Sequence, residues 1–188
     1  MGLAITDLKK GTIFKLEGVP YRVVEYSQKV MGRGGSIVNV RIKSLLDGRV
    51  LAKTFKGNEQ LDSADVGYRN VQYLYNDGET FYFMDDESYE QFELPAADLA
   101  EQAGYMKEGD RVQAQMFEER VINVELSKNV PLEVTYTEDV VKGDTTSSVL
   151  KDATVETGIT VKVPAFVKTG DVISVDTSTG AYRERVKE

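Results

Sequence analysis

Residues 71–84 read Val71-Gln72-Tyr73-Leu74-Tyr75-Asn76-Asp77-Gly78-Glu79-Thr80-Phe81-Tyr82-Phe83-Met84. Aromatic and aliphatic residues predominate on both sides of the central polar segment, and such residues favour strands. The Asp77-Gly78 pair is typical of a tight turn, because both residue types tolerate the backbone conformations that such turns need. The stretch therefore predicts a β-hairpin.

The segment that precedes this hairpin also has the patterns of strands joined by turns. Residues 38–43 alternate apolar and polar side chains, as a half-buried strand does, and residues 21–26 supply a partner strand. Asp47-Gly48 predicts a turn before a further strand at residues 49–52. Residues 1–64 therefore predict a small barrel of short antiparallel strands.

The segment that follows the hairpin predicts one short helix at residues 95–103. Pro95 suits a first helical position, Leu99 and Ala103 lie four residues apart, and Gly104 suits a C-terminal cap. Strands resume at residues 111–124. One short helix among about five strands is compatible with a Greek-key barrel of the OB type.

The last third of the chain begins a new set of strands after Pro131. Alternation returns at residues 132–136, and further strands are predicted at residues 160–163 and 172–176. No clean internal repeat is visible, yet two successive β segments of about 60 residues permit a duplicated barrel. We therefore predict an all-β protein of three small barrel domains, residues 1–64, 65–127 and 128–188.

The composition limits the catalytic groups and metal ligands that the chain can provide. The 188 residues include no His and no Cys, so disulfides, thiol nucleophiles and the common transition-metal ligands are excluded. The adjacent acids Asp85, Asp86 and Glu87 lack the spacing of a calcium-binding EF-hand, and we interpret them as a solvated acidic turn. We expect no metal at this turn, and from these residues alone carboxylate, Lys, Tyr or Ser/Thr chemistry stays open for an enzyme.

No apolar run approaches the roughly 20 residues that a membrane helix needs. The N-terminus also lacks the basic and apolar regions of a secretion signal. A cytoplasmic protein without membrane contact is the expectation.

The net charge of −8 is distributed unevenly along the chain. Residues 1–64 hold 11 Lys/Arg and 6 Asp/Glu, a net charge of +5. Residues 65–127 hold 4 and 15, a net charge of −11, and residues 128–188 hold 8 and 10, a net charge of −2. This asymmetry favours a first segment that approaches phosphate and a middle segment that stays solvated, and a chance imbalance in a soluble acidic protein is the alternative.

The most informative local feature is the segment Val30-Met31-Gly32-Arg33-Gly34-Gly35-Ser36 between two predicted strands. Three glycines allow backbone conformations that other residues avoid, and nothing bulky hides the arginine. A projecting guanidinium suits phosphate and base recognition in RNA. From these residues alone, a flexible loop with a solvated arginine is the alternative.

The whole chain from Gly11 onward resembles bacterial elongation factor P. The C-terminal signature of that family is found in residues 151–153, Gly158 and residues 161–170, which end in Val163-Pro164-Ala165-Phe166-Val167-Lys168-Thr169-Gly170. Residues 72–75 and 83–85 of the middle segment continue the resemblance.

The resemblance implies an L-shaped, monomeric translation factor with an SH3-like (KOW-type) first domain followed by two OB folds. Such a factor binds the 70S ribosome between the peptidyl and exit tRNA sites. Its first-domain tip reaches the CCA end of peptidyl-tRNA and relieves stalling at consecutive prolines. The ribosome remains the catalyst, so the factor itself is not expected to be an enzyme, and the resemblance implies no catalytic residue, no metal and no cofactor.

When the positions of the family are matched to this sequence, Arg33 is the tip residue. Many members have lysine there, so the resemblance implies an arginine-tip variant. Gly32 and Gly34 flank it, Gly35 completes the tip, and Met31 stands where proline is usual. In the family a tip lysine can be extended by a lysine-type group and a tip arginine by rhamnose. A modified Arg33, with a tip-modifying enzyme as a further partner, and a bare Arg33 both stay open.

Two further sites follow from the resemblance. Gly143, Asp144 and Thr145 match a loop that approaches the exit-site codon on the small subunit. Tyr182 and Arg185 are candidate RNA contacts, with a packing tyrosine and a surface arginine as the equal alternative.

Three other functions stay open. A paralogue group similar to elongation factor P shares the architecture and differs in its stalling repertoire. A generic single-stranded RNA-binding protein would not depend on Arg33. A carboxylate-dependent hydrolase would need a constellation of paired acids, which the sequence does not show.

Overall fold

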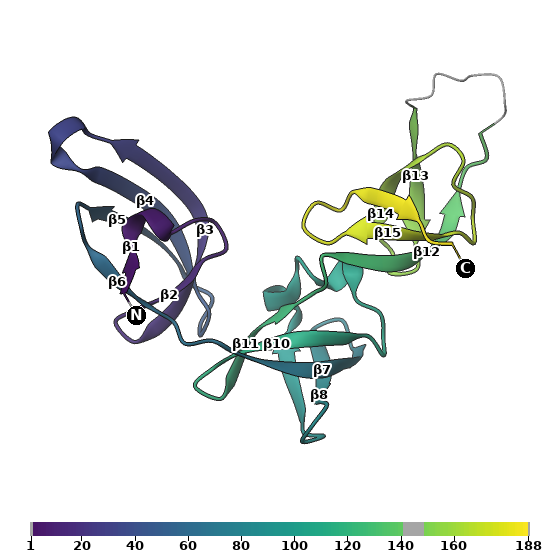
Figure 1. Cartoon of the computed structure of the whole chain (residues 1–188). Helices are drawn as coiled ribbons and strands as arrows, with labels where there is room; N and C mark the ends of the chain where they lie inside the picture. The colour runs from purple at the N-terminus through teal and green to yellow at the C-terminus, as the bar shows by residue number, and fades with distance from the viewer. Residues whose placement is uncertain (1, 141–148, 188) are drawn as a thin grey trace. The chain divides into compact units, whose positions relative to one another are not determined.

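The computed structural model describes residues 2–140 and 149–187, and within them the chain is almost entirely β. Its strands form three antiparallel sheets that follow one another along the chain (Figure 1). The all-β prediction is therefore confirmed. No helix in this part of the chain is long or apolar enough to cross a membrane.

The first sheet has six strands in the order β1-β6-β2-β3-β4-β5. Their bounds are β1 Gly2–Ala4, β2 Ile13–Leu16, β3 Val19–Val30, β4 Ser36–Ser44, β5 Val50–Lys56 and β6 Gln60–Ser63. A 3-10 turn, η1 (Ile5–Asp7), joins β1 to the rest. The alternating residues 38–43 lie in β4 and send Val38, Val40 and Ile42 into the core, because strand neighbours point to opposite faces.

The second sheet has five strands in the order β11-β10-β7-β8-β9. Their bounds are β7 Gly67–Asn76, β8 Thr80–Asp85, β9 Gln91–Pro95, β10 Arg111–Phe117 and β11 Arg120–Glu125. The predicted hairpin at residues 71–84 is confirmed as β7 and β8, which pair Tyr73 with Phe83 across the strands. Its turn is closed by Asp77, whose carboxylate accepts hydrogen bonds from the backbone N–H groups of Glu79 (3.0 Å) and Thr80 (2.8 Å).

The helix predicted at residues 95–103 does not form an α-helix. Two 3-10 turns occupy this region instead, η3 (Ala96–Leu99) and η4 (Ala103–Tyr105), and Pro95 ends strand β9. An isolated segment of this length gains little from α-helical hydrogen bonding, so the burial of Leu99 in the core determines the local geometry.

The third sheet has five strands in the order β14-β13-β12-β15-β16. Their bounds are β12 Asn129–Thr137, β13 Leu150–Val155, β14 Thr160–Pro164, β15 Val172–Asp176 and β16 Tyr182–Arg185. Each sheet of five therefore has the same topology: the first strand is central, with the second and third on one side and the fourth and fifth on the other. This correspondence supports the interpretation as a duplicated barrel.

The chain divides into two compact units, which we describe separately. One contains residues 1–68 with 115–123, and the other contains residues 69–114 with 124–188. Within the first unit, the Arg22 guanidinium donates to the Gln115 side-chain oxygen (3.5 Å), and the Lys15 ammonium lies 5.7 Å from the centre of the Phe117 ring. The division into three domains at residues 64 and 127 stays a prediction.

Candidate functional site

The candidate site is the tip of the β3–β4 hairpin, which we define as residues 31–35. Strands β3 and β4 pair continuously from Tyr21 opposite Ser44 to Val30 opposite Ser36, with one bulge after Val23. Val38 is fully buried, whereas Val30 is 77% exposed. The hairpin therefore extends beyond the hydrophobic core of its sheet.

The tip is a single 3-10 turn, η2 (Gly32–Gly34), closed by a hydrogen bond from the Met31 N–H to the Gly35 carbonyl (3.1 Å). Gly32 and Gly35 have positive φ angles of 30° and 85°. Gly35 combines its φ of 85° with a ψ of −172°, a conformation that only glycine adopts readily. Two of the three glycines for which the sequence predicted unusual backbone conformations thus adopt positive φ angles.

Arg33 lies in the middle of η2 and is exposed. Within residues 2–140 and 149–187 its guanidinium makes no hydrogen bond or ion pair, and Met31 beside it is 56% exposed. All five guanidinium donors are thus free for an external partner that accepts hydrogen bonds.

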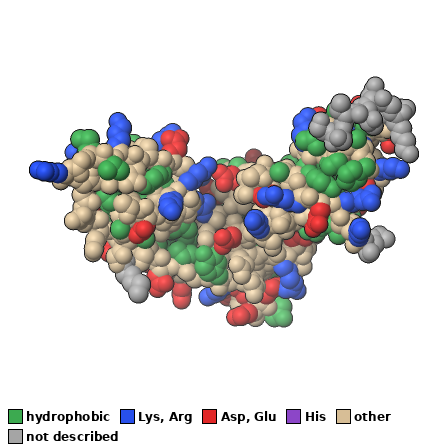
Figure 2. Space-filling model, turned by 45° about the horizontal axis from the view of Figure 1, so that its top comes forward, with side chains coloured by type: hydrophobic (Ala, Val, Ile, Leu, Met, Phe, Trp, Pro, Cys, Tyr) green, Lys and Arg blue, Asp and Glu red, His purple; other side chains and the backbone are tan. Residues whose placement is uncertain are grey.

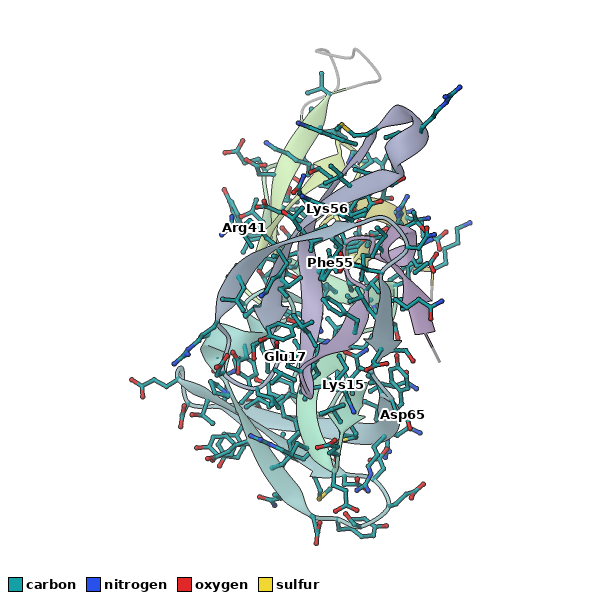
Figure 3. All side chains as sticks on the ribbon, turned by 90° about the vertical axis from the view of Figure 1, so that its left-hand side faces the viewer. Lys15, Glu17, Arg41, Phe55, Lys56 and Asp65 are labelled. Atoms are coloured by element: carbon teal, nitrogen blue, oxygen red, sulfur yellow. The ribbon has the colours of Figure 1, made fainter. Side chains whose placement is uncertain are left out.

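Strand pairing brings two further cations to the tip end of the sheet, which sequence reasoning missed. Ile37 lies between Lys29 on β3 and Lys56 on β5, so both lysines are on the outer face of the sheet. Figure 3 labels Lys56 beside the buried Phe55 on β5. Alternation alone could have assigned each lysine to a face, but only the register places the two on one row.

The cations on this face are not all equivalent. Arg41, further from the tip, pairs with Glu25 of β3 at 3.1 Å (Figure 3). Lys29 and Lys56 form no ion pair in the described part of the chain, although Glu59 accepts a hydrogen bond from the Lys56 backbone N–H (3.1 Å). Blue Lys and Arg side chains project from the first domain at the left of Figure 2.

The other predicted contact residues belong to the last third of the chain. Gly143, Asp144 and Thr145 lie outside the described residues. Tyr182 is partly buried and packs against the core of the third sheet. Arg185 lies over the exposed ring of Phe166, 5.7 Å from its centre, and pairs with Asp171 at 3.7 Å. Arg33 lies in one compact unit, and Tyr182 and Arg185 lie in the other.

The acidic turn at Asp85 differs from the prediction of a solvated cluster. Asp85 is buried and accepts hydrogen bonds from the N–H groups of Glu87 (2.8 Å) and Ser88 (3.0 Å). These hydrogen bonds, first that from Ser88, hold the pKa of Asp85 below its ordinary value. The carboxylate therefore closes a turn, and the described residues contain no group of three or more potential metal ligands.

Comparison with known proteins assigns each sheet to a type of domain. Residues 4–61 match the family model described as the elongation factor P (EF-P) KOW-like domain, and residues 66–124 match its OB domain. Residues 130–185 match the model described as elongation factor P, C-terminal. The chain is thus a translation factor built from a KOW-like domain followed by OB-type barrels.

Relatives of known name cover the chain completely. It is 42% identical over 187 residues to elongation factor P of Helicobacter pylori (strain P12) and to that of Wolinella succinogenes, with 100% of both chains covered in each case. The chain belongs to the elongation factor P family, and the predicted family resemblance is confirmed.

Among solved structures, the chain is similar to eukaryotic translation initiation factor 5A from Methanococcus jannaschii. The match has a TM-score of 0.49 and 20% identity, and it covers 66% of this chain and 94% of that chain. A translation initiation factor eIF-5A family protein from Naegleria fowleri matches with a TM-score of 0.41 and 15% identity, covering 67% of this chain and 98% of that chain.

Proposed function

We propose that this translation elongation factor binds the ribosome between the peptidyl and exit tRNA sites and relieves stalling at consecutive prolines. The observation that supports this most directly is Arg33, exposed and without an internal partner among the described residues, on a glycine-flanked turn in a chain that belongs to the elongation factor P family. The proposed place of action is the cytoplasm, where ribosomes work.

The proposed contribution to peptide-bond formation is positional. Arg33 reaches the CCA end of peptidyl-tRNA, and its guanidinium pairs with phosphate or stacks on a base. Holding the tRNA end in a productive geometry lowers the entropic part of the barrier without an added acid, base or nucleophile. The ribosome supplies the catalysis in this proposal, and the factor acts as a non-catalytic monomer.

The test is a reconstituted translation assay with a polyproline reporter. Wild-type protein is expected to relieve the stall, and Arg33→Ala to lower the maximal rate roughly tenfold to a hundredfold, because misplaced reactants react that much more slowly. Arg49→Ala is the matched control, since Arg49 is an exposed arginine that pairs with Asp47 in the turn between β4 and β5, away from the tip. A wild-type protein without effect would overturn the proposal and favour the paralogue group.

The same variants separate the proposal from generic single-stranded RNA binding. A generic binder keeps its affinity for RNA and its effect on the reporter in the Arg33→Ala variant, because its contacts are spread along the surface. The proposed factor loses its effect on the reporter. Equal activity of Arg33→Ala and wild type would therefore favour the generic binder.

The chemical state of Arg33 is a separate question, because family members with a tip arginine can carry rhamnose there, whereas Met31 stands where that subgroup usually has proline. A modified and a bare Arg33 are both compatible with the proposed function, and a modification would lengthen the reach of the tip. Intact-protein mass spectrometry of the protein from its native host distinguishes the two. An unmodified mass means that bare Arg33 suffices and that no tip-modifying enzyme is needed.

The other contacts are proposals of the same kind. The loop with Gly143, Asp144 and Thr145 is proposed to approach the exit-site codon on the small subunit. Arg185 is proposed as an RNA contact on the family resemblance, with the exposed ring of Phe166 beneath its guanidinium as a neighbouring surface. Packing of Tyr182 against the core favours a structural role for that residue.

A further inference from the structure

The end of the β3–β4 hairpin lacks hydrophobic support. Val38 is the last fully buried residue of β4 towards the tip, and the next pair on that face is Val30 with Ser36. Val30 is 77% exposed, so burial of apolar area does not hold this end of the hairpin. Polar contacts must therefore limit the motion of the tip.

A ladder of side-chain hydrogen bonds runs along that face towards the tip. The Tyr26 ring packs against the core of the first sheet, and its hydroxyl donates to the Gln28 side-chain oxygen (2.9 Å). The Gln28 amide nitrogen then donates to the Ser36 hydroxyl oxygen (3.1 Å). The ladder thus connects the core to the first residue after the tip.

The register explains why Gln28 reaches Ser36. Gln28 lies opposite Val38, and Ser36 lies opposite Val30, so Gln28 and Ser36 are diagonal neighbours on one face. Such diagonal neighbours are within reach of a long side chain. Gln28 therefore ties β3 to β4 across the base of the tip.

Ser36 is also held from its other side. Its carbonyl accepts a hydrogen bond from the Gly57 N–H (3.1 Å), where the chain leaves β5. A Cβ on Gly35 would lie 3.5 Å from the Gly57 Cα, so the backbones approach closely at this point. Ser36, the first residue after the tip, is therefore held both by β3 and by the end of β5.

We propose that Gln28 is a positioning residue for Arg33, acting through Tyr26 and Ser36 to fix the direction in which the tip points. The inference rests on the proposed function, in which Arg33 must meet the end of a tRNA. Gln28 itself touches no substrate. Its removal leaves the cations of the tip in place but lets the tip sample more directions, so the productive geometry is populated less often.

The experiment compares four variants with wild type in the polyproline assay, recording the maximal rate and the half-saturating concentration of factor. Gln28→Leu and Ser36→Ala each break the ladder. Ser36→Thr keeps the hydroxyl and suits a strand. Ser27→Ala is the matched control, because Ser27 pairs with Asn39 on the opposite face of the same strand.

Gln28→Leu, which removes two hydrogen bonds of the ladder, and Ser36→Ala, which removes one, are each expected to lower the maximal rate roughly threefold to tenfold. The half-saturating concentration should change by less than about twofold, because the residues that bind the ribosome are intact. Ser36→Thr and Ser27→Ala should match wild type. The double variant Gln28→Leu/Ser36→Ala should be no slower than Gln28→Leu alone, because Gln28→Leu already removes the hydrogen bond to Ser36.

Any of three results would overturn the inference. Gln28→Leu could have the wild-type maximal rate, or it could raise the half-saturating concentration and leave the maximal rate unchanged. Ser36→Thr and Ser36→Ala could also have equally low maximal rates. Amide hydrogen exchange of residues 31–36 provides a readout that does not depend on the ribosome. Faster exchange in Gln28→Leu and wild-type exchange in Ser36→Thr are expected. If wild type fails to relieve stalling, the proposed function fails, and the exchange result alone decides whether Gln28 braces the tip.

Discussion

Single residues determine what the tip can do. Arg33 has free donors because the turn that carries it consists otherwise of glycine, and Gly35 adopts a φ of 85° that a residue with a Cβ avoids. The buried polar side chains, by contrast, are satisfied internally: no buried side-chain nitrogen or oxygen in the described residues lacks a hydrogen-bond partner. An exposed arginine without a partner is therefore a candidate for function, whereas the buried acids serve the fold.

Asp176 is the clearest example of an acid that serves the fold. It is 1% exposed, ends β15 and accepts hydrogen bonds from the Arg183 guanidinium and from the hydroxyl (2.5 Å) and backbone N–H (2.8 Å) of Ser178. The Arg183 contact first, and then those from Ser178, hold the pKa of Asp176 well below its ordinary value of 3.8.

The lowered pKa predicts acid sensitivity of the third sheet. A carboxyl whose pKa is lower in the folded state stabilises the fold above its unfolded pKa of 3.8, and this stabilisation disappears as the pH falls towards the folded value. In urea unfolding, Asp176→Asn should be less stable than wild type near pH 7, and the difference should shrink near pH 3. A difference that is equal at both pH values would contradict the prediction.

At the scale of elements, the same turn precedes the fourth strand of both sheets of five. Residues 107–110 read Lys-Glu-Gly-Asp, and residues 168–171 read Lys-Thr-Gly-Asp. In each turn the aspartate carboxylate accepts a hydrogen bond from the lysine backbone N–H, at 2.8 Å for Asp110 and 2.9 Å for Asp171. The glycine N–H groups bind the carbonyls of Tyr73 and Val134, on the central strands. The two sheets of five therefore share individual hydrogen bonds as well as the same order of strands.

Contacts between elements also restrict residue size. Gly104 in η4 lies against the turn between β13 and β14, where the Thr157 hydroxyl donates to its carbonyl (2.6 Å). A Cβ on Gly104 would lie 2.6 Å from the Cγ2 atom of Ile159, closer than real contacts allow. The position therefore requires glycine for space rather than for backbone conformation.

Gly104→Ala is expected to lower the free energy of unfolding by about 1–3 kcal/mol, the usual cost of overpacking. Combining it with Ile159→Ala should cost less than the sum of the two single changes, because the clashing methyl group is removed. Gly67→Ala is the control, since its Cβ would lie 3.8 Å from the Met116 Cβ, an ordinary contact. Strict additivity in denaturant unfolding would show that the clash is relieved in another way.

At the scale of the whole molecule, the first and second segments of the chain have net charges of opposite sign. The first 64 residues have a net charge of +5 and the next 63 have −11. A partner rich in phosphate is therefore attracted to the first segment and repelled by the second, which favours one orientation of approach. Lys29 and Lys56, on one row beside the tip, add to the positive end.

This distribution predicts how salt affects ribosome binding. Replacing Lys29 and Lys56 by alanine should weaken binding at low salt and reduce the slope of log affinity against log salt by about 0.7 to 0.9 for each phosphate that the variant no longer neutralises. Lys53→Ala is the control, because Lys53 pairs with Val40 and lies on the opposite face of β5. An unchanged slope in the double variant would exclude the two lysines as phosphate ligands.

The sequence alone determined the features that depend on neighbours along the chain. The period of two in residues 38–43 and the Asp77-Gly78 turn are local signals, so the hairpins and the all-β class could be predicted from them. The glycines around Arg33 likewise indicate the exposed turn, and the C-terminal signature indicated the elongation factor P family, to which the chain belongs.

Tertiary structure alone decided the features that depend on register and burial. The segment 95–103, for which the sequence predicted a helix, forms two 3-10 turns, and Leu99 in the first of them is buried. Asp85, which we had expected to be solvated, is buried and closes a turn. The diagonal contact from Gln28 to Ser36 and the row from Lys29 to Lys56 likewise required the register of β3, β4 and β5. The physical reason is that side chains on neighbouring strands meet according to their pairing, which the composition of either strand by itself does not specify.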